Sequence, residues 1–140
     1  MNVIIPPVDD NPSDCDIHFL DDRINEYNVE RTGITDGKIL SYFARDENRA
    51  IIAGLYGWTW GECCEVRYLW VRHDYRNRGY GKGLMQAAEN EAIARGCRQI
   101  VLDTHSFQAP RFYQALGFKI VGTHADYPHG HRKHYLKKTL

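Results

Sequence analysis

Apolar residues near the N-terminus recur at the spacing of a helix. Four of them lie at i, i+3, i+7 and i+10, so a helix would place them on one face. They are Ile17, Leu20, Ile24 and Tyr27. Gly33 follows, and glycine commonly terminates a helix because it adopts positive φ without a steric penalty. The pattern predicts an amphipathic helix that ends at Gly33.

Several segments in the first half of the chain have the apolar, β-branched and aromatic composition of strands. Val3–Ile5 is followed by two prolines and is predicted as a short edge strand. Ile39–Ala44 and Ala50–Trp58 are separated by a polar turn, which predicts a hairpin. Cys64–Val71 then continues the antiparallel sheet.

A strand–helix–strand unit follows. The apolar positions of Lys82–Arg95 have helical spacing, and Gly96 stands where a left-handed stop is expected. Gln99–Asp103 is a second apolar run with the length of a strand. Because two strands joined by one crossover helix run parallel, Cys64–Val71 and Gln99–Asp103 are expected to form a βαβ unit.

The C-terminal part predicts a short helix and a last pair of strands. Pro110 suits the first turn of a helix, where no N–H donor is needed, and Gly117 would end that helix. Ile120–His124 and His134–Thr139 are the predicted strands, on either side of the loop Asp126–His131. Together the elements predict an α/β fold with a mixed sheet.

Length and composition favour one globular domain over residues 1–140. The hydrophobic fraction is 43% and the chain contains three tryptophans, enough for a packed core. Its longest apolar run is far shorter than the ~20 residues that cross a membrane, and the N-terminus lacks the features of a secretion signal. The four cysteines have no metal-ligand spacing and are interpreted as reduced thiols. We therefore expect a cytoplasmic protein without a membrane partner.

The net charge is zero, but the charges are distributed unevenly. Residues 1–30 contain eight acids against Arg23 alone, whereas residues 111–140 contain six bases against Asp126 alone. Without a basic stripe, nucleic acid is not an expected partner. The asymmetry is interpreted as a solvated surface, with the alternative of an acidic rim that attracts a cationic amine.

Between the first strand of the βαβ unit and its helix lies a stretch rich in glycine and arginine, Arg76–Gly81. Glycines let backbone N–H groups approach a ligand closely, and the N-terminus of a helix attracts anions. Positive charge is added around it by Arg72, Arg76, Arg78 and Lys82. A strand, a glycine-arginine turn and a helix therefore predict a site for a diphosphate.

The spacing of the glycines selects among three phosphate-binding turns. A P-loop is excluded because Gly83, not serine or threonine, follows Lys82. The dinucleotide fingerprint would need a glycine where Leu84 stands. Arg76–Gly81 fits the third pattern, (Gln/Arg)-x-x-Gly-x-(Gly/Ala), without a gap. In this stretch the chain resembles the coenzyme A loop of the GNAT superfamily of N-acetyltransferases.

A second segment supports the resemblance. Ser106–Phe118 is similar to the GNAT segment Asn-x-x-Ala-x-x-Phe-Tyr-x-x-x-Gly-Phe, with Ser106 at the Asn position. Both segments occur in the family's order, separated by one helix and one strand, and the resemblance extends from Cys64 to Phe118. The loop Asp126–His131 resembles that of small bacterial members.

The resemblance implies a GNAT fold, with a mixed sheet of about six or seven strands, helices on both faces and two central strands that splay apart. It implies acetyl-CoA as co-substrate and transfer of the acetyl group to a primary amine of a small molecule, by direct attack in a ternary complex. A protein or peptide acceptor and a non-catalytic acyl-CoA-binding domain remain alternatives, and a homodimer remains open. The positions that would bind the coenzyme are Leu69, Trp70, Val71, Arg76, Arg78, Gly79, Tyr80, Gly81, Lys82, Gly83 and Ser106.

The same resemblance implies two residues that handle protons. Tyr113 occupies the Phe-Tyr position and would donate a proton to the departing CoA thiolate; the alternative is an aromatic that fills a helix–sheet gap. Glu65 lies fourteen residues before Gly79, as the strand glutamate of histone-modifying members does, and would accept a proton from the acceptor. A solvated glutamate paired with Arg67, with a water chain as base, is the alternative.

Histidines gather near the C-terminus without the signature of a metal site. They are His124, His129, His131 and His134. Only Asp126 accompanies them as a further potential ligand, so no metal is predicted. These histidines would line the acceptor pocket or lie at the surface.

Overall fold

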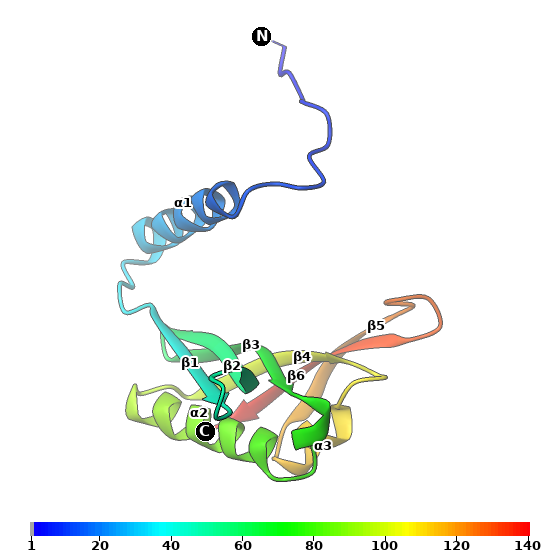
Figure 1. Ribbon diagram of the computed structural model, residues 1–140. Helices are drawn as coiled ribbons and strands as arrows, with labels where there is room; N and C mark the ends of the chain where they lie inside the picture. Colours follow the sequence, from blue (N-terminus) through cyan, green and yellow to red (C-terminus); the bar gives the residue numbers. More distant parts are fainter. Residues whose placement is uncertain (1) are drawn as a thin grey trace. The chain divides into compact units, whose positions relative to one another are not determined.

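The computed structural model describes residues 2–140 and comprises two compact units, one ending at Thr35 and one spanning Asp36–Leu140. In the first unit, helix α1 (Asp14–Thr32) follows an irregular N-terminal segment (Figure 1). The side chain of Ser13 caps its first turn. Gly33 ends it with φ 71°, as the sequence predicted.

The predicted edge strand at Val3–Ile5 is wrong, because these residues form no regular element in the structure. A strand needs a neighbour to bond its N–H and C=O groups, and Pro6 and Pro7 remove two donors directly after it. The composition of a segment indicates that it could form a strand, but it does not indicate whether a second strand lies beside it to pair with.

The second unit contains one six-stranded sheet, in the strand order β1-β2-β3-β4-β6-β5 (Figure 1). Its strands are β1 (Lys38–Arg45), β2 (Ile51–Trp60), β3 (Cys63–Val71), β4 (Gln99–His105), β5 (Lys119–Ala125) and β6 (Arg132–Thr139). Neighbours are antiparallel except β3 and β4, which run parallel. The predicted hairpin, βαβ unit and final strand pair are confirmed.

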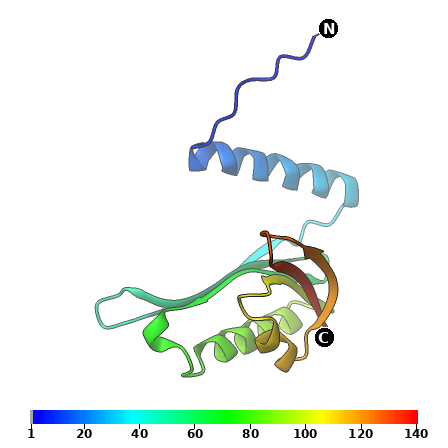
Figure 2. The same ribbon diagram turned by 90° about the vertical axis from the view of Figure 1, so that its right-hand side faces the viewer.

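Two helices and a 3₁₀ turn, η1 (His73–Tyr75), connect the strands of this unit. Helix α2 (Tyr80–Ala94) joins β3 to β4, and α3 (Pro110–Ala115) joins β4 to β5. Both helices lie on the same face of the sheet (Figures 1 and 2). A helix on the other face, which the resemblance implied, stays a prediction. None of the helices in residues 2–140 has both the length and the apolar character needed to cross a membrane.

The core lies between the sheet and these helices. Leu55, Ile100 and Leu136 come from three different strands and pack in one cluster with residues of α2. The α2 members include Met85 and Ala88, and all five side chains are at most 3% exposed. Because side chains alternate along a strand, the residues next to these strand positions point to the opposite face of the sheet.

The sheet opens at its centre, where β3 and β4 diverge after three residue pairs, the last being Glu65 with Val101. On its other side β3 has one extra residue, Arg67, where the register with β2 shifts. Gly57 of β2 lies beside this bulge, and a Cβ atom there would overlap the carbonyl oxygen of Glu65. The bulge and the divergence produce the splayed central strands that the resemblance implied.

Candidate active site

A cavity of about 1030 Å³ occupies the opening between β3 and β4. One wall is the C-terminal half of β3, and another is the loop that leads into α2. The end of β4 and the start of α3 complete it. Beyond the segments 66–71, 75–77 and 79–82, the lining residues are Leu102, Asp103, Thr104, His105, Phe107, Gln108, Ala109, Phe112, Tyr113 and Lys133.

The start of α2 contributes backbone N–H groups to this cavity. Gly79 precedes the helix with φ 89°, a conformation that favours glycine, and no side chain caps the first turn. The first helical hydrogen bond runs from the Gly83 N–H to the Gly79 carbonyl at 2.9 Å. The N–H groups of Tyr80, Gly81 and Lys82 therefore have no helical acceptor, and these are the donors that a bound anion would use.

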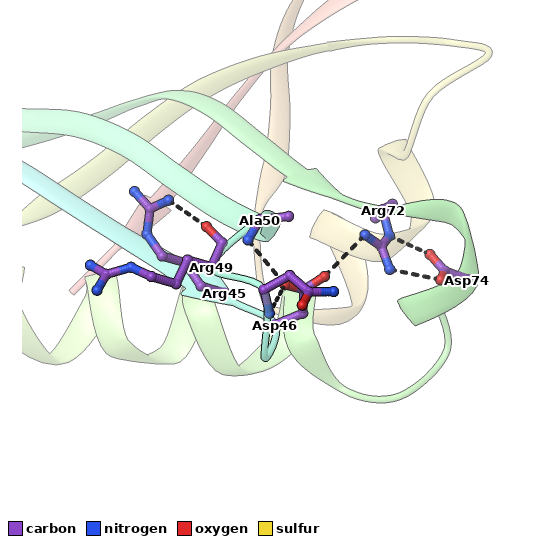
Figure 3. Close-up of polar contacts among 7 residues, drawn as sticks. Arg45, Asp46, Arg49, Ala50, Arg72 and Asp74 are labelled. Atoms are coloured by element: carbon purple, nitrogen blue, oxygen red, sulfur yellow. Dashed lines mark hydrogen bonds and ion pairs between the residues drawn. The ribbon is translucent and has the colours of Figure 1, made fainter.

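Ion pairs fix the loop before α2 and balance the charge of one of its arginines (Figure 3). Arg72 contacts Asp46 of the β1–β2 turn at 3.6 Å and Asp74 at 2.7 Å. The hydrogen bond from Arg72 lowers the pKa of Asp74. Asp46 in turn accepts from the N–H groups of Asn48 and Ala50. Arg72 therefore links the β1–β2 hairpin to the loop. Two carboxylates balance the positive charge of Arg72, which the sequence predicted to attract an anionic ligand.

Arg76 of this loop and Lys82 of the first turn of α2 are the basic side chains that line this end of the cavity. The Arg76 Nε donates to the Val71 carbonyl at 3.0 Å, which holds the guanidinium beside the end of β3. Arg78 lies over the ring of Tyr75, 5.1 Å from its centroid, and does not line the cavity. The positive charge at this end of the cavity is therefore that of Arg76 and Lys82.

Nine of the thirteen residues predicted for the site line the cavity, namely Leu69, Trp70, Val71, Arg76, Gly79, Tyr80, Gly81, Lys82 and Tyr113. The remaining four are Glu65, Arg78, Gly83 and Ser106. Ser106 continues the pairing of β4 with β6: its N–H donates to the Arg132 carbonyl at 2.8 Å, and its hydroxyl accepts from the Arg132 N–H at 3.0 Å. In this structure the Ser106 hydroxyl is used to hold the strand end.

Tyr113 combines a core ring with a position on the cavity wall. Its ring packs edge-on against Phe112 and Phe118, with centroids 5.0 and 5.9 Å away, and the residue is 7% exposed. Burial, with a smaller contribution from the charge of Asp103, raises the pKa of Tyr113 to about 12. The phenol therefore stays protonated at physiological pH and is available as a donor. Both interpretations of the sequence, core aromatic and proton donor, fit this position.

Glu65 stands at the point where β3 and β4 separate. Burial is the main cause that raises the pKa of Glu65; the charge of Arg67 lowers it and the charge of Asp103 raises it further. A carboxylate with a raised pKa is a stronger proton acceptor than a solvated one. Val66 and Arg67 line the cavity, whereas Glu65 does not.

The end of the cavity at β4 contains residues that the sequence did not indicate. Asp103 and His105 belong to β4, and His105 is paired directly with Lys133 of β6. The Gln108 Oε1 accepts from the His105 backbone N–H at 2.7 Å and lies 3.0 Å from the His105 Nδ1. The pairing register of β4 with β6 brings the side chains of His105 and Lys133 together, and this register could not be read from the sequence.

The cysteine and histidine side chains have structural surroundings. Cys64 is fully buried in β3, and burial raises the pKa of its thiol to about 11, which makes it a weak nucleophile at neutral pH. His124 stacks on Tyr127 at 6.1 Å, and His131 packs edge-on against Phe107 at 5.0 Å. Among residues 2–140, no group of three or more histidine, cysteine or carboxylate side chains has a metal-binding arrangement.

The chain is similar in sequence to known proteins. The sequence model of the family described as "Acetyltransferase (GNAT) family" matches residues 9–118. The chain belongs to the GNAT family of acetyltransferases. It is 33% identical to the blasticidin-S acetyltransferase of Streptomyces morookaense over 116 residues, 80% of this chain and 85% of that one. It is 30% identical to an acetyltransferase of Agrobacterium fabrum over 138 residues, 99% of this chain and 98% of that one.

Solved structures share the GNAT fold over nearly the whole chain. A crystal structure of an acetyltransferase from Agrobacterium tumefaciens matches with a TM-score of 0.86 at 28% identity and covers 100% of both chains. One from Bacillus cereus matches with a TM-score of 0.76 at 30% identity, over 96% of this chain and 98% of that one. The GNAT fold and the acetyltransferase class expected from the two motifs are confirmed.

Proposed function

We propose that this GNAT acetyltransferase moves the acetyl group of acetyl-CoA to a primary amine of a small molecule, by direct attack within a ternary complex. The observation that supports this most is one continuous cavity with two chemically different ends. One end is the uncapped start of α2 with Arg76 and Lys82, and the other is the separation of β3 and β4 beside Tyr113. A phosphate-bearing donor and an amine could meet inside it.

The donor end has the groups that a CoA thioester needs. The N–H groups of Tyr80–Lys82 would bind its pyrophosphate, with Arg76 adding charge. The main chain of Leu69–Val71 follows the last residue pair of β3 with β4, so this edge of β3 is open to the cavity. Its N–H and C=O groups would bond the pantetheine arm and polarise the thioester carbonyl.

The reaction itself needs two proton transfers. The amine nitrogen attacks the thioester carbon, and the C–S bond breaks when the tetrahedral intermediate collapses. Tyr113 would donate its proton to the departing thiolate. Glu65, through a water molecule, would take the proton from the amine. The role of the donor fits Tyr113, because its phenol, with a pKa of about 12, is protonated at neutral pH.

A small-molecule acceptor is supported by the relative that acts, by its name, on blasticidin S. A protein or peptide acceptor is the second candidate, and a non-catalytic acyl-CoA-binding role is the third. Tyr113 on the cavity wall favours catalysis over binding alone, since binding does not require a proton donor. A cytoplasmic location stays a prediction.

Two measurements test the proposal. Calorimetric titration with acetyl-CoA tests the donor end by itself. An assay of CoA release with blasticidin S, aminoglycosides, polyamines, amino acids and peptides tests the acceptor class. We expect release with at least one small amine. Release with peptides alone would move the acceptor to proteins, and binding of acetyl-CoA without release would favour the non-catalytic role.

A further inference from the structure

The ammonium group of Lys133 lies between two aromatic rings at the end of the cavity. Its Nζ is 4.9 Å from the ring centroid of Tyr127 and 5.5 Å from that of Tyr135. The Asp103 Oδ1 lies 3.9 Å from it, and the Lys133 side chain is 17% exposed. Ring faces around a cation are the arrangement by which proteins recognise ammonium ligands. We define Asp103, Tyr127 and Tyr135 as the ammonium box.

The box faces away from the helices of its unit. Leu102 and Leu136 are buried in the core with residues of α2, so Asp103 and Tyr135, their neighbours along β4 and β6, point to the other face of the sheet. Asp103 and Lys133 nevertheless line the same cavity as Tyr113. Through Asp103 the box therefore adjoins the cavity from the face opposite α2, which leaves the start of α2 free for the donor.

Lys133 is held more loosely than Lys138, another lysine of β6. The Lys138 Nζ donates a hydrogen bond to the Glu89 Oε2 at 2.8 Å. The 3.9 Å between Lys133 and Asp103 is too long for a hydrogen bond, and within residues 2–140 the Lys133 Nζ finds no other acceptor. Ring faces and charge alone hold this ammonium, so replacing it with that of a ligand breaks no hydrogen bond of the protein.

Further aromatic and histidine rings pack against the tyrosine rings of the box. His105 stacks on Phe107 at 5.1 Å and on Tyr127 at 5.8 Å, and Tyr127 stacks on His124 at 6.1 Å. The His124 ring in turn packs edge-on against Tyr135 at 5.6 Å. Because each ring limits the movement of the next, the box keeps its shape when Lys133 leaves it.

We propose that the ammonium box binds an ammonium group of the acceptor, and that Lys133 occupies the box as an internal substitute until the acceptor displaces it. The inference rests on the proposed function and adds a substrate class to it. The side chain of Lys133 is a primary ammonium on a four-carbon chain, so the acceptor carries a primary ammonium on an aliphatic chain. Asp103 balances its charge and the two tyrosine rings cover its methylene groups.

Binding of n-butylammonium ions tests this proposal without acetyl-CoA and without turnover. Lys133→Ala empties the box, and Lys119→Ala, at an exposed lysine of β5, is the matched control. NMR titration of the tyrosine and histidine ring signals compares n-butylammonium chloride with sodium butyrate at equal ionic strength. We expect the Kd for n-butylammonium to fall about tenfold in Lys133→Ala and not in Lys119→Ala. Adding Asp103→Asn to Lys133→Ala should reverse the gain.

Equal affinity of the wild-type protein and Lys133→Ala for n-butylammonium would overturn the proposal. So would butyrate binding to the wild type that disappears in Lys133→Ala, because Lys133 would then be an anion-binding residue. Lys133→Gln, uncharged and of similar length, replaces the alanine variant if the latter fails to fold. Titration of the wild type with acetyl-CoA distinguishes a failure of this proposal from a failure of the proposed function. Acetyl-CoA binding tests the donor end and does not depend on what the ammonium box binds.

Discussion

The two ends of the cavity, which we propose to bind the donor and the acceptor, are built from different groups. The donor end is one short segment, in which the N–H groups of Tyr80–Lys82 and the charge of Arg76 are placed by the start of a helix. The proposed acceptor end adjoins the ammonium box, whose side chains Asp103, Tyr127 and Tyr135 come from two strands and a loop. Helix geometry fixes the directions of the backbone N–H groups whatever side chains the residues carry. The position of a binding side chain depends instead on how that side chain packs against its neighbours. The donor end should therefore respond to changes of backbone or helix charge, and the acceptor end to single side-chain replacements.

Because we propose Tyr113 and Glu65 as the groups that transfer protons, replacing them should affect turnover more than binding. Tyr113→Phe removes the hydroxyl and keeps the ring that packs on Phe112 and Phe118. We expect kcat to fall by roughly 10²–10⁴, the effect of a lost general acid, with acetyl-CoA affinity unchanged. Steady-state kinetics and calorimetry measure the two quantities.

A matched control for this variant is Tyr42→Phe. The Tyr42 hydroxyl donates to the Ala87 carbonyl at 3.2 Å and is not part of the cavity wall, so its loss should lower stability slightly and leave kcat unchanged. Wild-type turnover in Tyr113→Phe would remove this phenol from the mechanism and leave it as a core aromatic.

The second largest effect is expected at Gly57, which permits the bulge in β3 beside the point where β3 and β4 separate. A methyl group there would overlap the Glu65 carbonyl, so Gly57→Ala should lower the free energy of unfolding by roughly 3 kcal/mol, at the upper end of overpacking costs. Urea denaturation measures this change. Gly122→Ala, where a Cβ would have an ordinary 4.0 Å contact with Tyr135, is the control. Equal stability of the two variants would show that the bulge tolerates a side chain.

The backbone geometry of the proposed donor end could be predicted from the sequence because its determinants are local. Glycine spacing indicated where the helix begins, and Gly79 does adopt the positive φ that excludes most other residues. Arg72 is the exception. Its partner Asp46 lies in a distant turn, and no local pattern indicated that this carboxylate would balance the charge.

The acceptor end could not be predicted because it depends on strand register. The sequence predicted β4 and β6 as strands, but not that Asp103 pairs with Tyr135 and His105 with Lys133. A shift of one residue would turn all of these side chains to the other face. Strand pairing also explains the wrong prediction at Val3–Ile5. The composition of this segment suited a strand, but the sequence did not show that no strand in residues 2–140 pairs with it.

At the donor end, two substitutions of Gly81 distinguish the effect of a negative charge from the steric effect of a side chain. A Cβ at this position would lie 3.3 Å from the Phe112 ring, so Gly81→Ala and Gly81→Asp share the same steric contact. Only the aspartate adds a negative charge in the first turn of α2. We expect Gly81→Asp to weaken acetyl-CoA binding roughly tenfold relative to Gly81→Ala, as measured by calorimetry. Equal affinities would place the pyrophosphate elsewhere.

The smallest expected effect concerns the pH dependence of kcat. A base must be ionised to act, so the acidic limb of kcat should lie above the ordinary pKa of a glutamate if Glu65 is the base, because burial raises its pKa. Asp103 adds a negative charge that raises this pKa further, and Arg67 a positive charge that lowers it. Asp103→Asn should therefore move the acidic limb to lower pH, and Arg67→Gln to higher pH.

These two shifts must be measured as kcat at saturating acceptor, because Asp103 also belongs to the ammonium box and its loss should raise the acceptor KM. The opposite signs are what make the pair informative. A general loss of activity could lower kcat in both variants, but it would not move the limb in opposite directions. If the limb stays in place in both variants, Glu65 is not the titrating base, and a water chain that ends at another group accepts the proton.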